Sequence, residues 1–152
     1  MIQDEAAKRG VVLARNTAPL FGPTVEIRRP PLPETTAAPF APDLADTRRS
    51  IAVEFISRRD ADDHGEADGM RYASAHRIQT ARAARELAST VQKDGSQRLY
   101  FGTMYDPAGH VDPDPDADSW DAARLRAFAA NEEHLRAQVR DFLDWLQAQG
   151  AL

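Results

Sequence analysis

The chain has 152 residues, of which 19 are Lys or Arg and 24 are Asp or Glu, so its formal net charge is -5. This length suffices for one domain with its own hydrophobic core, and the acidic balance argues against a general nucleic-acid binder. No cysteine is present, which excludes disulfides, thiolate metal sites and cysteine nucleophiles. No apolar run reaches the roughly eighteen residues of a membrane helix. We therefore expect a soluble protein that does not enter membranes, cytoplasmic or, if phage-encoded, virion-associated.

Residues 1–49 are predicted to form an extended, proline-rich arm. Seven of the ten prolines fall between Pro19 and Pro42. Proline fixes φ and removes a backbone donor, so this stretch should adopt polyproline II and short β pieces rather than a helix. A linker that only needs solvation has no use for interleaved large apolar side chains. The arm therefore packs on its own domain or docks on another chain, with candidate contacts at Phe21, Leu32 and Phe40.

Residues 50–152 are predicted to form the globular domain. Alternating apolar residues predict a strand in SIAVEFISR from residue 50, and the aromatic, β-branched run 97–105 predicts a second. Between them a helix is expected from about Met70 to Val91. A strand, a helix of this length and a strand are typical of a βαβ unit with parallel strands.

Two further segments could add strands beside this unit. They are TVEIR at residues 24–28 and, less clearly, GVVLA at residues 10–14. The predicted fold class is therefore α+β: a small sheet that contains a βαβ unit and packs against two long helices.

The second long helix is predicted from Trp120 to Gln149, with Asp118 or Ser119 as its N-cap and Gly150 past its end. At 100° per residue its apolar side chains form one stripe, which we expect to be its core face. The stripe consists of Leu125, Phe128, Leu135, Val139, Phe142, Leu143 and Leu146.

Other residues of the two helices lie outside their apolar stripes or interrupt them. Trp120 and Trp145 lie off the main stripe of the last helix, so they are candidate interface anchors. Arg77 on the central helix and Glu132 on the last helix each interrupt an apolar stripe. They either pair with each other or sit at the rim in contact with water.

The first candidate for catalytic chemistry joins Asp43 to Glu54. The PD dipeptide at residues 42–43, a gap of ten residues and a Glu on a strand resemble the PD-(D/E)xK nuclease-like fold, and AVEFIS followed by acids resembles its Uma2 branch. The resemblance covers about thirty residues. It implies that Asp43 and Glu54 hold Mg²⁺, whereas the activating lysine position is occupied by Ile56. The residues alone favour the alternative that Asp43 lies in a turn and Glu54 on the solvent face of a strand.

Two acidic loops are further candidates. Residues 60–68 hold five carboxylates and His64, and they follow a predicted strand; Asp60 and His64 could ligate a metal or act as a base, or the loop is simply solvated. In residues 106–121 the aspartates alternate as in a calcium loop, although Ala117 and Ala123 replace the expected Gly and Glu. The alternative is a solvated acidic connection that stabilises the start of the last helix. The alternating set is Asp112, Asp114, Asp116 and Asp118.

These features favour a non-catalytic interaction or assembly protein that needs no cofactor. It would be an adaptor or structural component of a bacterial or phage complex, and its arm would dock on a protein partner or on another copy of the chain. One alternative is a metal-dependent, nuclease-like hydrolase that uses Mg²⁺ or Ca²⁺, with Asp43 and Glu54 as ligands and Asp60 and His64 nearby. A third is a small-molecule or regulatory binding domain with a pocket above the sheet.

Overall fold

The chain forms an α+β fold, as the sequence predicts. The computed structural model describes residues 1–16, 24–28, 35–39, 41–57, 60, 76–93, 99–107 and 119–152. In chain order its elements are α1 (Ile2–Ala7), β1 (Ala14–Arg15), β2 (Thr24–Arg28), β3 (Thr35–Pro39), β4 (Leu44–Asp46), β5 (Ile51–Ile56), α3 (His76–Lys93), β6 (Tyr100–Tyr105) and α4 (Trp120–Ala148).

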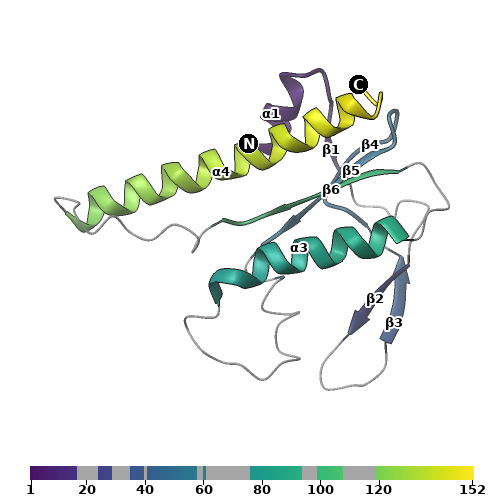
Figure 1. Ribbon diagram of the computed structural model, residues 1–152, viewed down its shortest axis with the longest axis horizontal. Helices are drawn as coiled ribbons and strands as arrows, with labels where there is room; N and C mark the ends of the chain where they lie inside the picture. The colour runs from purple at the N-terminus through teal and green to yellow at the C-terminus, as the bar shows by residue number, and fades with distance from the viewer. Residues whose placement is uncertain are drawn as a thin grey trace.

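The main sheet has four strands in the order β1-β4-β5-β6. The first three are antiparallel to one another, whereas β6 runs parallel to β5, with Ile51 opposite Tyr100 and Ile56 opposite Tyr105. Helix α3 connects the two parallel strands, which confirms the predicted βαβ unit. Figure 1 shows α1 and α4 on one side of the sheet and α3 on the other.

The segment 24–28 is a strand, as expected, but it does not join the main sheet. It pairs with β3 in a separate antiparallel two-stranded sheet, in which Val25 lies opposite Ala38. Two strands this close in sequence pair at a low entropic cost of loop closure. Of the predicted strand at residues 10–14, only Ala14 belongs to β1. Phe21, Leu32 and Phe40 lie outside the described residues.

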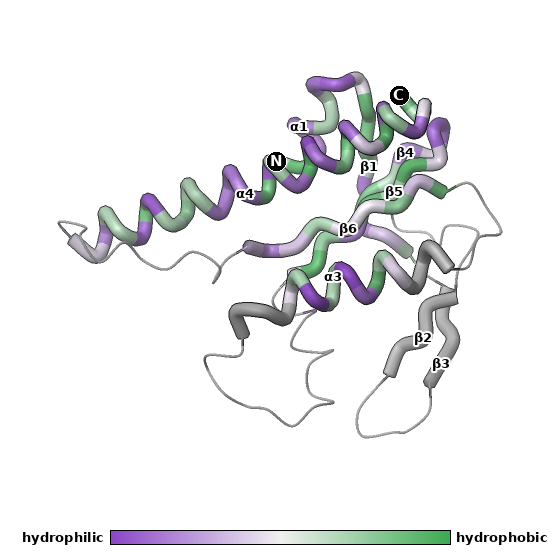
Figure 2. Tube along the Cα trace, in the orientation of Figure 1, coloured by the Kyte–Doolittle hydropathy of each residue, from purple (hydrophilic) through white to green (hydrophobic). Residues whose placement is uncertain are grey.

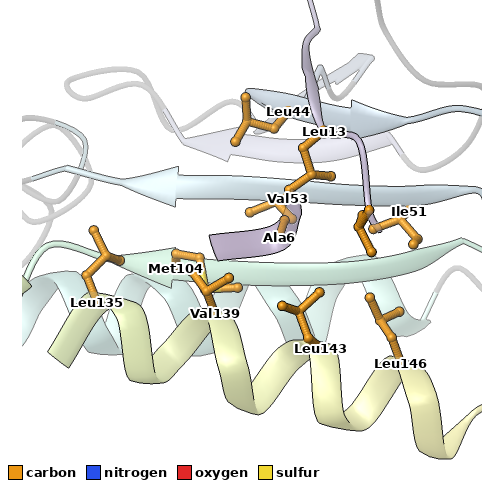
Figure 3. Close-up of a cluster of buried hydrophobic side chains, with 11 residues drawn as sticks. Ala6, Leu13, Leu44, Ile51, Val53, Met104, Leu135, Val139, Leu143 and Leu146 are labelled. Carbon is orange, nitrogen blue, oxygen red and sulfur yellow. The ribbon is translucent and has the colours of Figure 1, made fainter. Parts of the chain in front are cut away.

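The larger core cluster lies between the sheet and α4. Leu135, Val139, Leu143 and Leu146 point from successive turns of α4 toward the strands, as Figure 3 shows. The strand side chains that meet them include Ile51, Val53 and Met104. The same cluster takes in residues before position 50, so the predicted arm and the predicted domain share one core; these residues are Ala6, Val11, Leu13 and Leu44.

The opposite face of the sheet carries a smaller cluster. Ala52 and Phe101 are buried there, with Leu87 of α3 packed against them. Ala84 is also buried, and small side chains let a helix approach a sheet closely. Near the start of α3, the Thr80 hydroxyl donates a hydrogen bond of 3.0 Å to the carbonyl oxygen of Asp106. This bond ties α3 to the chain just after β6.

An ion-pair network joins α1 to α4. The carboxylate of Glu5 is almost fully buried and lies 2.6 Å from Lys8 Nζ and 3.2 Å from Arg136 Nη1. The hydrogen bond and the charge of Lys8, aided by a hydrogen bond from Arg136 and the charge of Arg140, hold the pKa of Glu5 below its usual value against the opposing effect of burial. Arg136 also pairs with Glu132 at 2.7 Å. Glu132, which interrupts the apolar stripe of α4, is thus paired with a residue of its own helix. The side chain of Arg77 lies outside the described residues.

Helix α4 also covers part of the outer edge of β6. The Gln138 side-chain amide accepts from the Tyr105 backbone N–H at 2.9 Å and donates to the Tyr105 carbonyl at 3.1 Å. This amide takes the place of a neighbouring strand at an otherwise open edge. The predicted ends of α4 are confirmed: Ser119 caps it by accepting from the Ala122 N–H at 3.2 Å, and Gly150 follows it at φ 70°.

We predict that Gly102→Ala destabilises the protein. A Cβ on Gly102 would lie 2.7 Å from Cε2 of Phe142, so the ring would have to move. Overpacking of this kind costs about 1–3 kcal/mol of unfolding free energy, measurable by urea denaturation. In a Phe142→Leu background the same change should cost less, because the clash is gone. An equal cost in both backgrounds would show that the contact with Phe142 is not the cause.

Candidate functional site

Two of the carboxylates that the sequence singled out lie side by side: Asp43 immediately precedes β4, and Glu54 lies on the adjacent strand β5. The pairing of Leu44 with Val53 places Asp43 beside Glu54. The Asp43 backbone N–H donates to Oε2 of Glu54 at 2.9 Å, and the Phe55 N–H donates to Oδ2 of Asp43 at 3.0 Å. The side chains therefore continue the hydrogen bonding between β4 and β5 beyond the last backbone pair, and both carboxylates are held in place.

A third predicted residue, Asp60, lies just after β5. Its Oδ2 accepts from the Ser57 N–H at 2.8 Å and from the Ser57 hydroxyl at 2.6 Å. The Asp60 N–H in turn donates to the Ser57 hydroxyl at 3.3 Å. This reciprocal turn fixes Asp60 near the carboxyl end of β5, where its charge acts on Glu54. We call Asp43, Glu54 and Asp60 the carboxylate cluster.

The pKa of Glu54 is raised to about 7. Burial is the main cause, since it removes water from the charged form. The hydrogen bond from the Asp43 N–H opposes this shift, whereas the negative charges of Asp43 and Asp60 add to it. Near neutral pH the Glu54 carboxyl group can therefore be populated in both its protonated and its ionised form.

A carboxyl group that titrates near pH 7 can accept or donate a proton in a reaction. In the part of the chain that the structure describes, no three His, Asp or Glu side chains are placed to hold one metal ion. Ile56, which stands where the resemblance expects lysine, is 3% exposed and supplies no cation. The other predicted ligands, His64 and the aspartates at 112, 114, 116 and 118, lie outside the described residues.

The second candidate site is the N-terminal part of α4, which reaches past the ends of the strands (Figure 1). Leu125 is 69% exposed and Phe128 57% exposed, which corrects the expectation that both belong to the core face. They precede the buried Leu135 by ten and seven residues, so they continue the same face of the helix. Figure 2 shows hydrophobic positions recurring along the whole of α4, including this part.

The two tryptophans differ in their surroundings. Trp120, at the start of α4, is 85% exposed. Trp145 is 40% exposed; it stacks on Phe142 with ring centroids 5.7 Å apart and meets Tyr100 edge-on at 6.0 Å. Much of Trp145 thus packs within its own chain. We call Trp120, Leu125 and Phe128 the α4 tip surface.

The exposure of Leu125 and Phe128 could have been predicted by comparing the length of the helix with the length of the strands, which periodicity does not take into account. At 1.5 Å per residue, the 29 residues of α4 span about 43 Å. Six-residue strands such as β5 and β6 span only about 20 Å. A helix twice as long as the strands cannot be covered by them along its whole length.

Comparison with protein-family models, with curated proteins and with solved structures finds no match to this chain. Among the described helices, none is long and apolar enough to span a membrane.

We predict that the protein loses stability as the pH rises from about 5 to 7.5. In this range the folded state keeps a proton on Glu54 that the unfolded chain has released, so the free energy of unfolding falls. The expected loss is about 1–2 kcal/mol, less than the full shift implies because the carboxyl group is partly solvated. Urea denaturation across this pH range measures it.

The Glu54→Gln variant should remove most of this pH dependence, since an amide does not titrate. Glu86→Gln, which changes an exposed carboxylate on α3, is the matched control and should retain it. An identical pH profile in the wild type and Glu54→Gln would contradict the assignment.

Proposed function

We propose that this chain is a non-catalytic interaction or assembly protein, an adaptor or structural component of a bacterial or phage complex, that docks on a protein partner. The observation that carries the proposal is the α4 tip surface: Leu125 and Phe128 are exposed one turn apart on the projecting part of α4, and Trp120 is exposed at the start of the same helix. Burying one such side chain contributes about 1.5–3 kcal/mol. The surface therefore favours association.

The interface extends, in this proposal, to the proline-rich segment with Phe21, Leu32 and Phe40. The ends of that segment are anchored, since Leu13 before it and Leu44 after it are both buried in the core. An anchored segment loses less conformational entropy on docking than a free tail.

The proposal predicts that the chain in its native source elutes well above its monomer mass of 16.8 kDa. Size-exclusion chromatography of a gently prepared lysate, with immunodetection, measures this. The double variant L125Q/F128Q should shift to lower mass, because it removes the apolar contact without removing a core side chain. Val12→Gln is the matched control, since Val12 is 72% exposed elsewhere on the surface.

Elution of the wild-type chain at the monomer mass, in a lysate where a known complex stays intact, would contradict the proposed function. Loss of the larger species in Val12→Gln as well as in L125Q/F128Q would contradict the role of the α4 tip surface.

A second candidate function, a metal-dependent nuclease-like hydrolase, is favoured by one specific observation. Burial is the main cause of the raised pKa of Glu54, and the negative charges of Asp43 and Asp60 add to it, so a divalent cation there would offset the repulsion among the three carboxylates. Asp43 and Glu54 would be the ligands. Ile56 occupies the position where this family has its activating lysine, so the cation that activates water would have to come from another residue.

This candidate predicts that millimolar Mn²⁺ or Mg²⁺ raises the thermal unfolding midpoint by a few degrees, as ligand binding to the folded state alone does. Glu54→Gln should lose the response and Glu86→Gln should keep it. A flat response of the wild type at about 10 mM metal, or an equal response of Glu54→Gln, would rule out the hydrolase reading.

A further inference from the structure

We propose that the occupant of the α4 tip surface is a second copy of this chain, bound by antiparallel crossing of the two α4 helices near Phe128. This inference rests on the proposed function and names the partner. The contact would be isologous, with the same surface on both chains, which is the arrangement of a two-fold dimer.

The apolar centre of the contact is self-complementary. Leu125 and Phe128 lie one turn apart on the same face of α4, so in an antiparallel crossing each Phe128 meets the Leu125–Phe128 pair of the other helix. Arg124 lies over the Phe128 ring at 5.4 Å from its centroid, which leaves the other face of the ring for the partner. Phe128 is 57% exposed in the single chain.

The charges on either side of this centre decide the orientation. Arg124 lies one turn before Phe128 and Glu132 one turn after it, and both lie toward the Leu125–Phe128 face of the helix. Antiparallel helices place Arg124 of one chain opposite Glu132 of the other, and parallel helices would place like charges together. The side chain of Glu132 is 50% exposed, so the Arg124 of a second copy can reach it.

The intrachain partner of Glu132 does not prevent the contact. Glu132 pairs with Arg136 one turn later, at 2.7 Å. Each carboxylate has two oxygens and several acceptor sites, so a second arginine adds to the pair rather than displacing it.

The size of the surface sets the expected affinity. Three exposed side chains fall short of the roughly 800 Å² per partner that a standard stable interface buries. We therefore expect a weak, reversible dimer with a Kd on the order of 10–100 µM. The dimer would be populated where the chain is locally concentrated, as in an assembly.

The test is sedimentation equilibrium of the purified full chain across concentrations from about one-tenth to ten times the expected Kd. The average mass should rise from 16.8 kDa toward twice that value. L125Q/F128Q should stay monomeric, and Val12→Gln should dimerise as the wild type does. A wild-type mass that stays monomeric throughout, or a rise that L125Q/F128Q retains, would overturn the inference.

Charge reversal tests the same contact independently. Arg124→Glu leaves only acidic groups flanking Phe128 on the contact face and Glu132→Arg leaves only basic ones, so each variant alone should be monomeric. An equimolar mixture should dimerise, because the two tips then attract each other. A mixture that remains monomeric would overturn the inference.

Orientation can be read from cross-linking, since the chain has no native cysteine. Arg124→Cys and Glu132→Cys should form disulfides with each other in a mixture and much less with themselves. Stronger self-linking of Arg124→Cys would overturn the antiparallel arrangement.

The inference can fail while the proposed function survives. If the purified chain is monomeric but the native chain elutes in a larger complex that L125Q/F128Q disrupts, the occupant is a different protein. If the native chain is also monomeric, both fail.

Discussion

The packing of the C-terminal half of α4 on the β5–β6 pair organises the rest of this structure. Leu135, Val139, Leu143 and Leu146 are nearly fully buried against the sheet, and α1 is held to the same helix through Glu5. The strands are about half as long as α4. Once this half is fixed, the other half meets none of the described strands, and its apolar side chains Leu125 and Phe128 are exposed.

The projecting half has local reasons to stay helical. Ser119 caps its first turn, and alanine, the best helix former, recurs through residues 122–130. The i,i+4 pair of Glu132 with Arg136 supports the junction between the two halves. The projecting half alone would be only marginally stable as an isolated helix, but the packed half nucleates it. The helix can thus present side chains to a partner with little loss of entropy.

Local signals predicted much of this fold. The parallel β5–β6 unit, the limits of α4 and its Ser119 cap follow from periodicity, length and capping residues. The neighbourhood of Asp43 and Glu54 was also predicted, through a family resemblance. The raised pKa of Glu54 was not, because burial depends on what covers the α3 face of the sheet. Likewise, periodicity placed Leu125 and Phe128 on the correct face of α4 but could not tell where the sheet beneath that face ends.

The most direct test of this account is amide hydrogen exchange along α4 at low and high protein concentration. We expect residues 135–146 to exchange slowly at both concentrations, at rates close to those of global unfolding. Residues 122–131 should exchange much faster in dilute protein and slow down when the chain is concentrated, as the tips pair. Uniform, concentration-independent protection along the whole of α4 would contradict the division of this helix into a packed half and an uncovered, self-associating half.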